Sequence, residues 1–225
     1  MRRAITNKKQ KTVKKMKPKL FFAIFSLAIF LVACQPEPVP LSGDILFEDD
    51  FSTHENQWTS FANDGGVMGY DAEGFRFFVR GAGMNYWTTL GLNFSDTRIE
   101  VDALQYAGPV ENRIGVICRY QNDQNFYFFV ISADGYYAIG KNKAGEQVLL
   151  GQDSMLYSSA IKTGMDINHL RAECEGSTLI FFVNDVSIAS VADTDFTEGD
   201  VGLLVGTFDV GELDVLFDNF AVLQP

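Results

Sequence analysis

Apolar and polar residues alternate with a period of two along most of the chain that follows residue 44. The clearest case is the stretch 113–141, where apolar side chains recur at every second position in three successive segments, 113–120, 125–132 and 135–141. Side chains of a β-strand point alternately to the two faces of a sheet, so this pattern predicts three consecutive antiparallel strands joined by short turns.

The pairing of these three strands follows from their turns. A turn at 121–124 places Tyr120 opposite Asn125, and a turn at 133–135 places Ser132 opposite Tyr136. With this register, one face is a core face that carries Ile114, Val116, Cys118, Tyr127, Phe129, Ile131, Tyr137 and Ile139. The opposite face carries Arg113, Gly115, Ile117, Arg119, Phe126, Phe128, Val130, Tyr136, Ala138 and Gly140.

This second face is too apolar for an ordinary solvated sheet surface, and it combines aromatic rings with an arginine. Contiguous exposed apolar patches usually mark interaction sites, and a guanidinium adds directional donors for hydroxyl or carboxylate oxygens. The alternative is that loops cover the face. We predict a ligand site, most readily a carbohydrate site, formed by Arg119, Phe126, Phe128 and Tyr136, with Trp87 from a neighbouring strand.

Further strands are predicted on both sides of this stretch, and no segment has the 3.6-residue period of a helix. About a dozen short strands at this spacing favour an all-β fold, a two-sheet antiparallel jelly-roll sandwich. The final strand breaks its own alternation, because Val215 and Phe217 must share a face with Phe220 and Val222; an extra residue at 218–219 predicts a β-bulge. The other predicted strands are 45–51, 74–80, 84–92, 97–106, 147–150, 168–175, 178–184, 186–192, 200–208 and 213–223.

Charge divides the chain into a basic leader and an acidic body. Residues 1–33 hold nine of the 18 Lys and Arg and no acid, whereas residues 34–225 hold the other nine and all 29 acids, a formal charge of 9 − 29 = −20. A body this acidic repels phosphate backbones, so nucleic acid is excluded as a partner.

The leader predicts export. Residues 20–33 form an apolar run of 14 residues, shorter than the roughly 20 that a membrane span needs but suited to a signal peptide over 1–33. The motif Leu31-Val32-Ala33-Cys34 resembles the lipobox of bacterial lipoproteins, which implies lipidation of Cys34. Residues 34–44, rich in proline, form a tether, and 45–225 form the sandwich. We expect an extracytoplasmic protein held to the membrane only by its lipid; the alternatives are a plain secretory signal or an uncleaved anchor.

Two cysteines remain once Cys34 carries the lipid. Cys118 and Cys174 both fall on inward faces of their strands, and an exported domain matures where disulfides persist. We predict a Cys118–Cys174 disulfide; the alternative is a pair of buried free thiols.

Four segments resemble the concanavalin A-like, laminin-G-like jelly rolls of bacterial surface proteins. They are FEDDFS (47–52), NHLRAEC (168–174), TLIFFVND (178–185) and VLFDNFAV (215–222), and within that group the chain resembles domains of the 3-keto-disaccharide hydrolase type. The resemblance implies two stacked sheets with the first and last strands paired, and one curved face used for ligands.

The same resemblance implies a structural calcium ion. Several jelly-roll carbohydrate-binding modules hold calcium between an acid of the first strand and an Asp of the last, which singles out Glu48 and Asp218. Backbone carbonyls and water would complete the six to eight oxygens that calcium needs. The alternative is that these acids cap strand ends through hydrogen bonds.

No catalytic motif is complete. Glu100 and Asp102 partly resemble the E-x-D-x-x-E strand of family 16 glycoside hydrolases, but Gln105 stands where the acid/base carboxylate belongs and an amide cannot exchange a proton. His169 is expected to be a solvated histidine. Three functions therefore stay open: a ligand-binding module, most readily for carbohydrate; a glycoside-cleaving enzyme of the 3-keto-disaccharide hydrolase type; and a structural or adhesion module.

Overall fold

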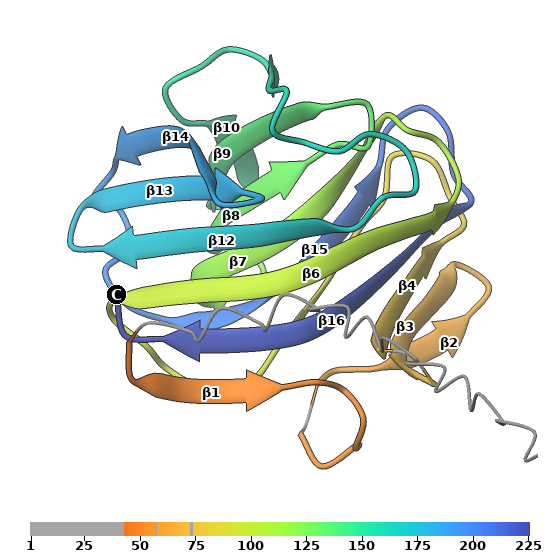
Figure 1. Cartoon of the computed structure of the whole chain (residues 1–225), viewed down its shortest axis with the longest axis horizontal. Helices are drawn as coiled ribbons and strands as arrows, with labels where there is room; N and C mark the ends of the chain where they lie inside the picture. Colours follow the sequence, from red (N-terminus) through yellow and green to blue (C-terminus); the bar gives the residue numbers. More distant parts are fainter. Residues whose placement is uncertain (1–42, 57, 73) are drawn as a thin grey trace, which may run out of the picture. The chain divides into compact units, whose positions relative to one another are not determined.

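The computed structural model describes residues 43–56, 58–72 and 74–225, and this part of the chain is all-β. Its sixteen strands form two antiparallel sheets that stack into a jelly-roll sandwich (Figure 1). Within these residues no helix is long and apolar enough to span a membrane.

The nine-stranded sheet is built around the last strand of the chain. Its order is β14 (Val186–Ala192), β13 (Thr178–Val183), β12 (Asn168–Glu175), β6 (Thr97–Ala107), β16 (Leu213–Leu223), β4 (Gly74–Val79), β3 (Gly66–Asp71) and β2 (Phe61–Asn63), and β1 (Ile45–Asp49) also pairs with β16.

The seven-stranded sheet contains the predicted three-stranded stretch at its centre. Its order is β10 (Glu146–Leu149), β9 (Tyr136–Lys143), β8 (Asn125–Ile131), β7 (Asn112–Asn122), β15 (Asp200–Thr207) and β5 (Asn85–Thr89), and β11 (Leu156–Tyr157) also pairs with β9.

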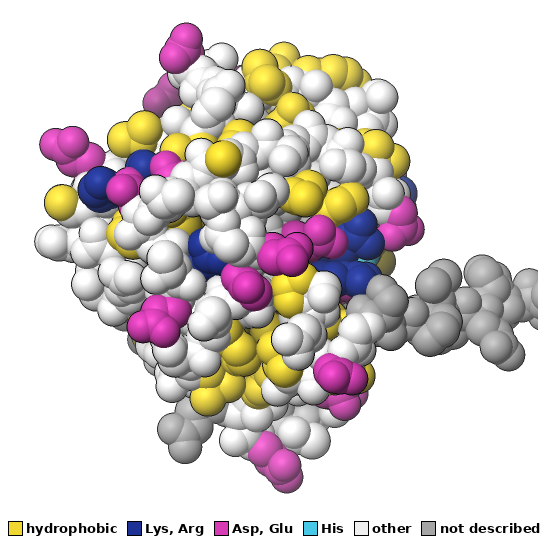
Figure 2. Space-filling view, turned by 90° about the vertical axis from the view of Figure 1, so that its left-hand side faces the viewer, with side chains coloured by type: hydrophobic (Ala, Val, Ile, Leu, Met, Phe, Trp, Pro, Cys, Tyr) yellow, Lys and Arg dark blue, Asp and Glu magenta, His cyan; other side chains and the backbone are white. Residues whose placement is uncertain are grey.

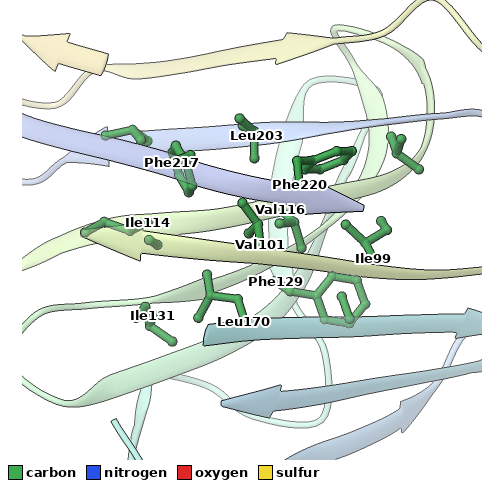
Figure 3. Close-up of a cluster of buried hydrophobic side chains, with 14 of the residues drawn as sticks. Ile99, Val101, Ile114, Val116, Phe129, Ile131, Leu170, Leu203, Phe217 and Phe220 are labelled. Atoms are coloured by element: carbon green, nitrogen blue, oxygen red, sulfur yellow. The ribbon is translucent and has the colours of Figure 1, made fainter. Parts of the chain in front are cut away.

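The core lies between the sheets and is made by the alternating apolar positions. Figure 3 shows side chains from both sheets meeting there, and none of those labelled is more than 3% exposed. Burying each such side chain stabilises the fold by about 1.5–3 kcal/mol. The predicted core face of 113–141 is confirmed, since all eight of its residues belong to this cluster. The labelled residues are Ile99, Val101, Leu170, Phe217 and Phe220 of the nine-stranded sheet, and Ile114, Val116, Phe129, Ile131 and Leu203 of the other.

The predicted register of this stretch is confirmed except at one end. Cys118 lies opposite Tyr127, and the β8–β9 hairpin has its predicted pairing. Tyr120, however, does not pair with Asn125; Asn122 does, so β7 runs further and the turn is shorter than predicted. Between these two pairs β7 has two extra residues, and it bulges at Arg119, whose φ is 51°.

A second bulge confirms the prediction made from the last strand. The register of β16 against β6 shifts between Asp218 and Ala221, and Asn219 has φ of 54°. Because of this bulge, Phe217 and Phe220 both reach the core.

The predicted disulfide is present and joins the two sheets. Cys118 of β7 bonds to Cys174 of β12 across the core, with Cα atoms 6.9 Å apart. The sequence analysis missed three short strands, β2, β3 and β11, which have two to six residues each and too little alternation to stand out.

Candidate functional site

The face of the seven-stranded sheet that points away from the core is concave. Arg113 of β7 donates from Nη1 to Oε1 of Gln147 on β10 at 3.4 Å, and the rings of Trp87 on β5 and Phe126 on β8 have centroids 5.6 Å apart. The two strands of each pair are three places apart in the sheet. Neighbouring strands are about 4.8 Å apart, so on a flat sheet the two strands would be separated by about 14 Å. Side chains stand roughly perpendicular to a sheet, so contact over that span requires the face to curve inward.

A cavity of about 230 Å³ lies on this concave face. Its walls are mostly apolar, and polar groups from three strands stand at its rim. None of the described residues that line it is an acid. The apolar lining is Phe128, Val130, Ala138, Leu149, Met155, Leu204 and Phe208, and the polar lining is Asn85, Arg113 and Gln147.

Two glycines make room for the side chains that shape this cavity. A Cβ at Gly140 of β9 would lie 2.2 Å from the ring of Phe128, so that ring rests directly on the backbone of β9. A Cβ at Gly206 of β15 would lie 2.1 Å from Oδ1 of Asn85. The Asn85 amide therefore packs flat against the sheet, with its oxygen held beside Arg113.

Arg113 is the charged group of the cavity. Its Nη1 donates to Oδ1 of Asn85 at 2.7 Å and to Gln147, and its guanidinium carbon lies 4.3 Å from the centre of the Phe208 ring. Burial lowers the pKa of Arg113 from its ordinary value, because burial disfavours the charged form. An arginine side chain is not deprotonated in proteins, so the cavity is cationic.

An aromatic group lies further along the same face. Trp87 packs on Phe126, and Tyr120 packs on the same ring at 5.7 Å. The Trp87 Nε1 and Tyr120 hydroxyl both donate to Oδ1 of Asp123, at 3.2 and 2.6 Å. Burial, together with this bond to Asp123, raises the pKa of Tyr120 to about 12. Trp87 and Tyr120 are half-buried, so each leaves part of its surface to solvent.

The segment after β10 covers part of the concave face but not all of it. Met155 of this segment and Leu149 at the end of β10 pack against Phe128 and its apolar neighbours, and both line the cavity. The sequence left open whether this face is a ligand site or is covered by loops. The structure has part of each, because a loop lies over one part of the face and a cavity remains at another.

Arg119 corrects the predicted site. Its side chain is 2% exposed, and its guanidinium donates to the carbonyls of Ser95, Gly176 and Phe196 and to the carboxylate of Asp96 at 2.8–3.1 Å. These partners come from three separate loops at one end of the sandwich. The bulge in β7 breaks the alternation on which the prediction rested, so Arg119 holds these loops together and does not reach the concave face.

The other predicted ligand residues lie on the outer face, but in different settings. Phe128 is a wall of the cavity, whereas Phe126 is fully buried beneath Trp87 and Tyr120. Tyr136 is 40% exposed and packs on Tyr157, with centroids 5.8 Å apart, outside the cavity. Their role in binding stays a prediction.

Arg113, Asn85 and Gln147 are functional candidates that the sequence analysis did not select. The alternation places Arg113 on the correct face, but nothing in the sequence favours it over Arg119. Asn85 and Gln147 come from strands whose neighbours in the sheet were not predicted. Only the pairing of β5 with β15 and of β10 with β9 brings them beside Arg113.

The two candidate carboxylates lie on the other sheet. Glu100 and Asp102 of β6 face away from the core of the nine-stranded sheet, opposite Arg171 and His169 of β12. Gln105 is buried, donates to the carbonyls of Gly108 and Pro109, and accepts from Asn112. No general-acid arrangement faces the cavity from this strand.

His169 is not the solvated histidine that the sequence suggested. Its Nδ1 lies 2.8 Å from Oδ1 of Asp102, and its Nε2 lies 3.7 Å from Oε2 of Glu100. The hydrogen bond to Asp102, and then the nearby Glu100 carboxylate, raise the pKa of His169 to about 9. Burial works to raise the pKa of Asp102, but its bonds to His169 and Asn219 outweigh burial and lower it. His169 is thus a cation at neutral pH within a ladder of opposite charges.

One of the two predicted calcium residues, Glu48, borders a polar groove of about 450 Å³. Glu48 is exposed and lines this groove, whereas Asp218 does not line it. Asp49, next to Glu48 in the chain, accepts hydrogen bonds from the Phe51 amide and from Trp58 Nε1, both at 2.8 Å. Burial, with the charges of Asp102 and Asp50, raises the pKa of Asp218. Among the described residues no group of three or more His, Cys, Asp or Glu is arranged to hold a metal. The calcium ion stays a prediction.

Cys34 and the signal peptide lie outside the described residues, so lipidation also stays a prediction.

Comparison with known proteins identifies the fold. No family model matches the chain, and no curated protein matches its sequence. Among solved structures, carbohydrate-binding module CBM66 of Bacillus subtilis is 21% identical with a TM-score of 0.59, covering 76% of this chain and 98% of the module. A Bacillus subtilis protein of unknown function with a galectin-like fold is 11% identical, with a TM-score of 0.58 and coverages of 81% and 96%. A family 16 glycoside hydrolase of Bacteroides ovatus is 12% identical, with a TM-score of 0.57 and coverages of 80% and 100%.

These likenesses place the chain in a class by fold alone. It is a jelly-roll β-sandwich of the kind found in carbohydrate-binding modules, galectin-like proteins and sandwich-fold glycoside hydrolases. At this level of identity the function has to be argued from the site itself.

Proposed function

We propose that the sandwich binds a carbohydrate in the cavity on the concave face of the seven-stranded sheet. The observation that carries the proposal is the composition of this cavity: apolar walls, among them Phe128, with Asn85, Arg113 and Gln147 at the rim. A sugar ring presents apolar C–H faces and a belt of hydroxyls, and such walls and rim groups match both. The likeness to a carbohydrate-binding module adds support at the level of the fold.

The same cavity supports binding rather than cleavage. Glycoside cleavage ordinarily uses two carboxylates on either side of the scissile bond. The described lining residues include no acid, and Glu100 and Asp102 lie on the other sheet, engaged with Arg98 and His169. No observation on the concave face favours the hydrolase alternative.

We further propose that the sandwich is displayed outside the cytoplasm of a bacterium by a lipid on Cys34. The support is the sequence alone: a basic leader, an apolar run of 14 residues and the lipobox-like Leu31-Val32-Ala33-Cys34. The proline-rich tether would hold the cavity away from the membrane.

A glycan array tests the binding proposal. The full chain in mild detergent is expected to retain a defined set of glycans. Asn85→Ala and Gln147→Ala should each weaken retention about two- to tenfold, because one hydrogen bond contributes about 0.5–1.5 kcal/mol. Gln224→Ala, an exposed glutamine remote from the cavity, is the matched control and should change nothing. Retention that ignores both rim variants, or no retention of any glycan, would contradict the proposal.

A further inference from the structure

Arg113 differs from the other half-buried and buried arginines of the sandwich in its partners. Arg76, Arg98, Arg119 and Arg171 each form an ion pair with a carboxylate. Basic side chains lie beside acidic ones elsewhere too: in the view of Figure 2, Lys and Arg side chains are next to Asp and Glu side chains. Among the described residues Arg113 has no carboxylate partner; it contacts two amide oxygens and one aromatic ring.

This lack of a partner stands out in so acidic a chain. The chain has 29 acids against 18 Lys and Arg, so carboxylates are abundant. Glu111 and Asp209, the acids nearest in sequence to Arg113 and Phe208, line a separate groove with Pro109 and Val210. Removing a charge from water is costly unless an opposite charge compensates it, and the amides of Asn85 and Gln147 supply only partial compensation. The positive charge of the cavity is therefore left for something outside the protein.

We infer that the cavity takes an acidic sugar, whose carboxylate or sulfate group pairs with Arg113. This inference rests on the proposed carbohydrate binding and specifies its ligand class. A guanidinium presents paired N–H donors that match the two oxygens of a carboxylate or sulfate. Asn85 and Gln147 hold the guanidinium in place from two sides, and Phe208 covers one of its faces, so the donors are oriented before the ligand arrives.

The size of the cavity agrees with a single acidic residue as the ligand unit. At about 230 Å³ it lies below the roughly 300–1,000 Å³ of common small-molecule sites. Its apolar walls would contact the ring while Arg113 holds the acidic group. The overall negative charge of the chain does not oppose this, because charges further than about 8 Å are screened at physiological salt.

The test compares each acidic sugar with its neutralised form. Oligogalacturonate and glucuronate are the carboxylate probes, with their methyl esters as matched neutral forms; a sulfated oligosaccharide and its desulfated form make the second arm. The full chain in mild detergent should bind at least one acidic probe, and neutralisation should weaken binding more than tenfold. Arg113→Gln should remove this preference and Arg113→Lys should retain part of it, whereas Arg80→Gln, an exposed arginine over Phe78, should leave it intact.

The outcomes separate this inference from the binding proposal. Equal affinity for acidic and neutralised probes, or binding confined to neutral glycans that still depends on Asn85 and Gln147, would overturn the acidic-sugar inference alone. Absence of binding to any glycan would overturn both. If Arg113→Gln fails to fold, the comparison of acid with ester on the unmodified chain decides the question by itself.

Discussion

Two arginines of one strand, Arg113 and Arg119, have opposite roles although alternation places them on the same face. Arg119 is buried and satisfies three backbone carbonyls and Asp96, so it is a structural residue. Arg113 borders a cavity and has no acid beside it among the described residues. The difference arises from the bulge that begins after Cys118, which turns Arg119 toward the end of the sandwich.

We predict that replacing these two arginines has unequal effects on stability. Arg119→Gln leaves carbonyls without donors and Asp96 without its partner, and it should lower the free energy of unfolding by about 2–4 kcal/mol. Arg113→Gln removes a charge that only two amide oxygens partly compensate, and should cost less than about 1 kcal/mol. Urea unfolding of both variants measures the difference; equal losses would contradict the assignment.

At the scale of elements, strands β6 and β12 form a ladder of opposite charges on the outer face of the nine-stranded sheet. Asp102, Glu100 and Arg98 of β6 lie opposite His169, Arg171 and Glu173 of β12, respectively. Opposite charges placed directly across a strand pair stabilise the pairing, whereas like charges would weaken it. The ladder therefore favours this register, and His169 is the one histidine in it.

The raised pKa of His169 predicts a pH dependence of stability. Because the folded pKa of about 9 lies above the unfolded value of 6.5, the contribution is complete below about pH 6.5 and is lost as pH rises through 9. The melting temperature should therefore fall as the pH rises from about 6.5 to 9, and the melting temperature of the His169→Gln variant should fall less over the same range. The chain has two histidines, so comparing NMR titrations of the unmodified chain and a His54→Gln variant assigns the imidazole signals of His169. A His169 pKa near 6.5 would contradict the predicted pH dependence.

Features that lie within a single strand could be predicted from the sequence. Alternation within a strand places the core residues and the Phe128 wall, and the broken alternation of β16 reveals its bulge, because these signals are local. The bulge at Arg119 depends on carbonyls that lie 24 to 77 residues away, which no local pattern encodes. The cavity rim likewise needs strand neighbours that only the tertiary structure supplies.

At the scale of the whole molecule, the lipid anchor can be tested separately from the sandwich. Cys34→Ser should leave an unlipidated chain that is not cleaved after Ala33 and keeps its apolar run at 20–33, whereas the unmodified chain should be cleaved, carry the lipid and enter the detergent phase of an extraction. The lipoprotein modification supplies more than one acyl chain, which stable attachment requires. The variant should keep its melting temperature, since residue 34 precedes the first strand. A variant that is processed and membrane-bound like the original would exclude lipidation at this position.

The position of β16 has a consequence for when the protein can fold. This strand, 213–223, is the last of the described strands to be synthesised, yet it pairs with β1, β4 and β6 near the middle of its sheet. Until the ribosome has released it, the strands on either side have no partner between them and their apolar faces stay uncovered. Sheets of such distant pairings also form slowly. A nascent chain whose sheet cannot close early stays unfolded for longer, and an unfolded chain is the form that can be threaded through a translocation channel.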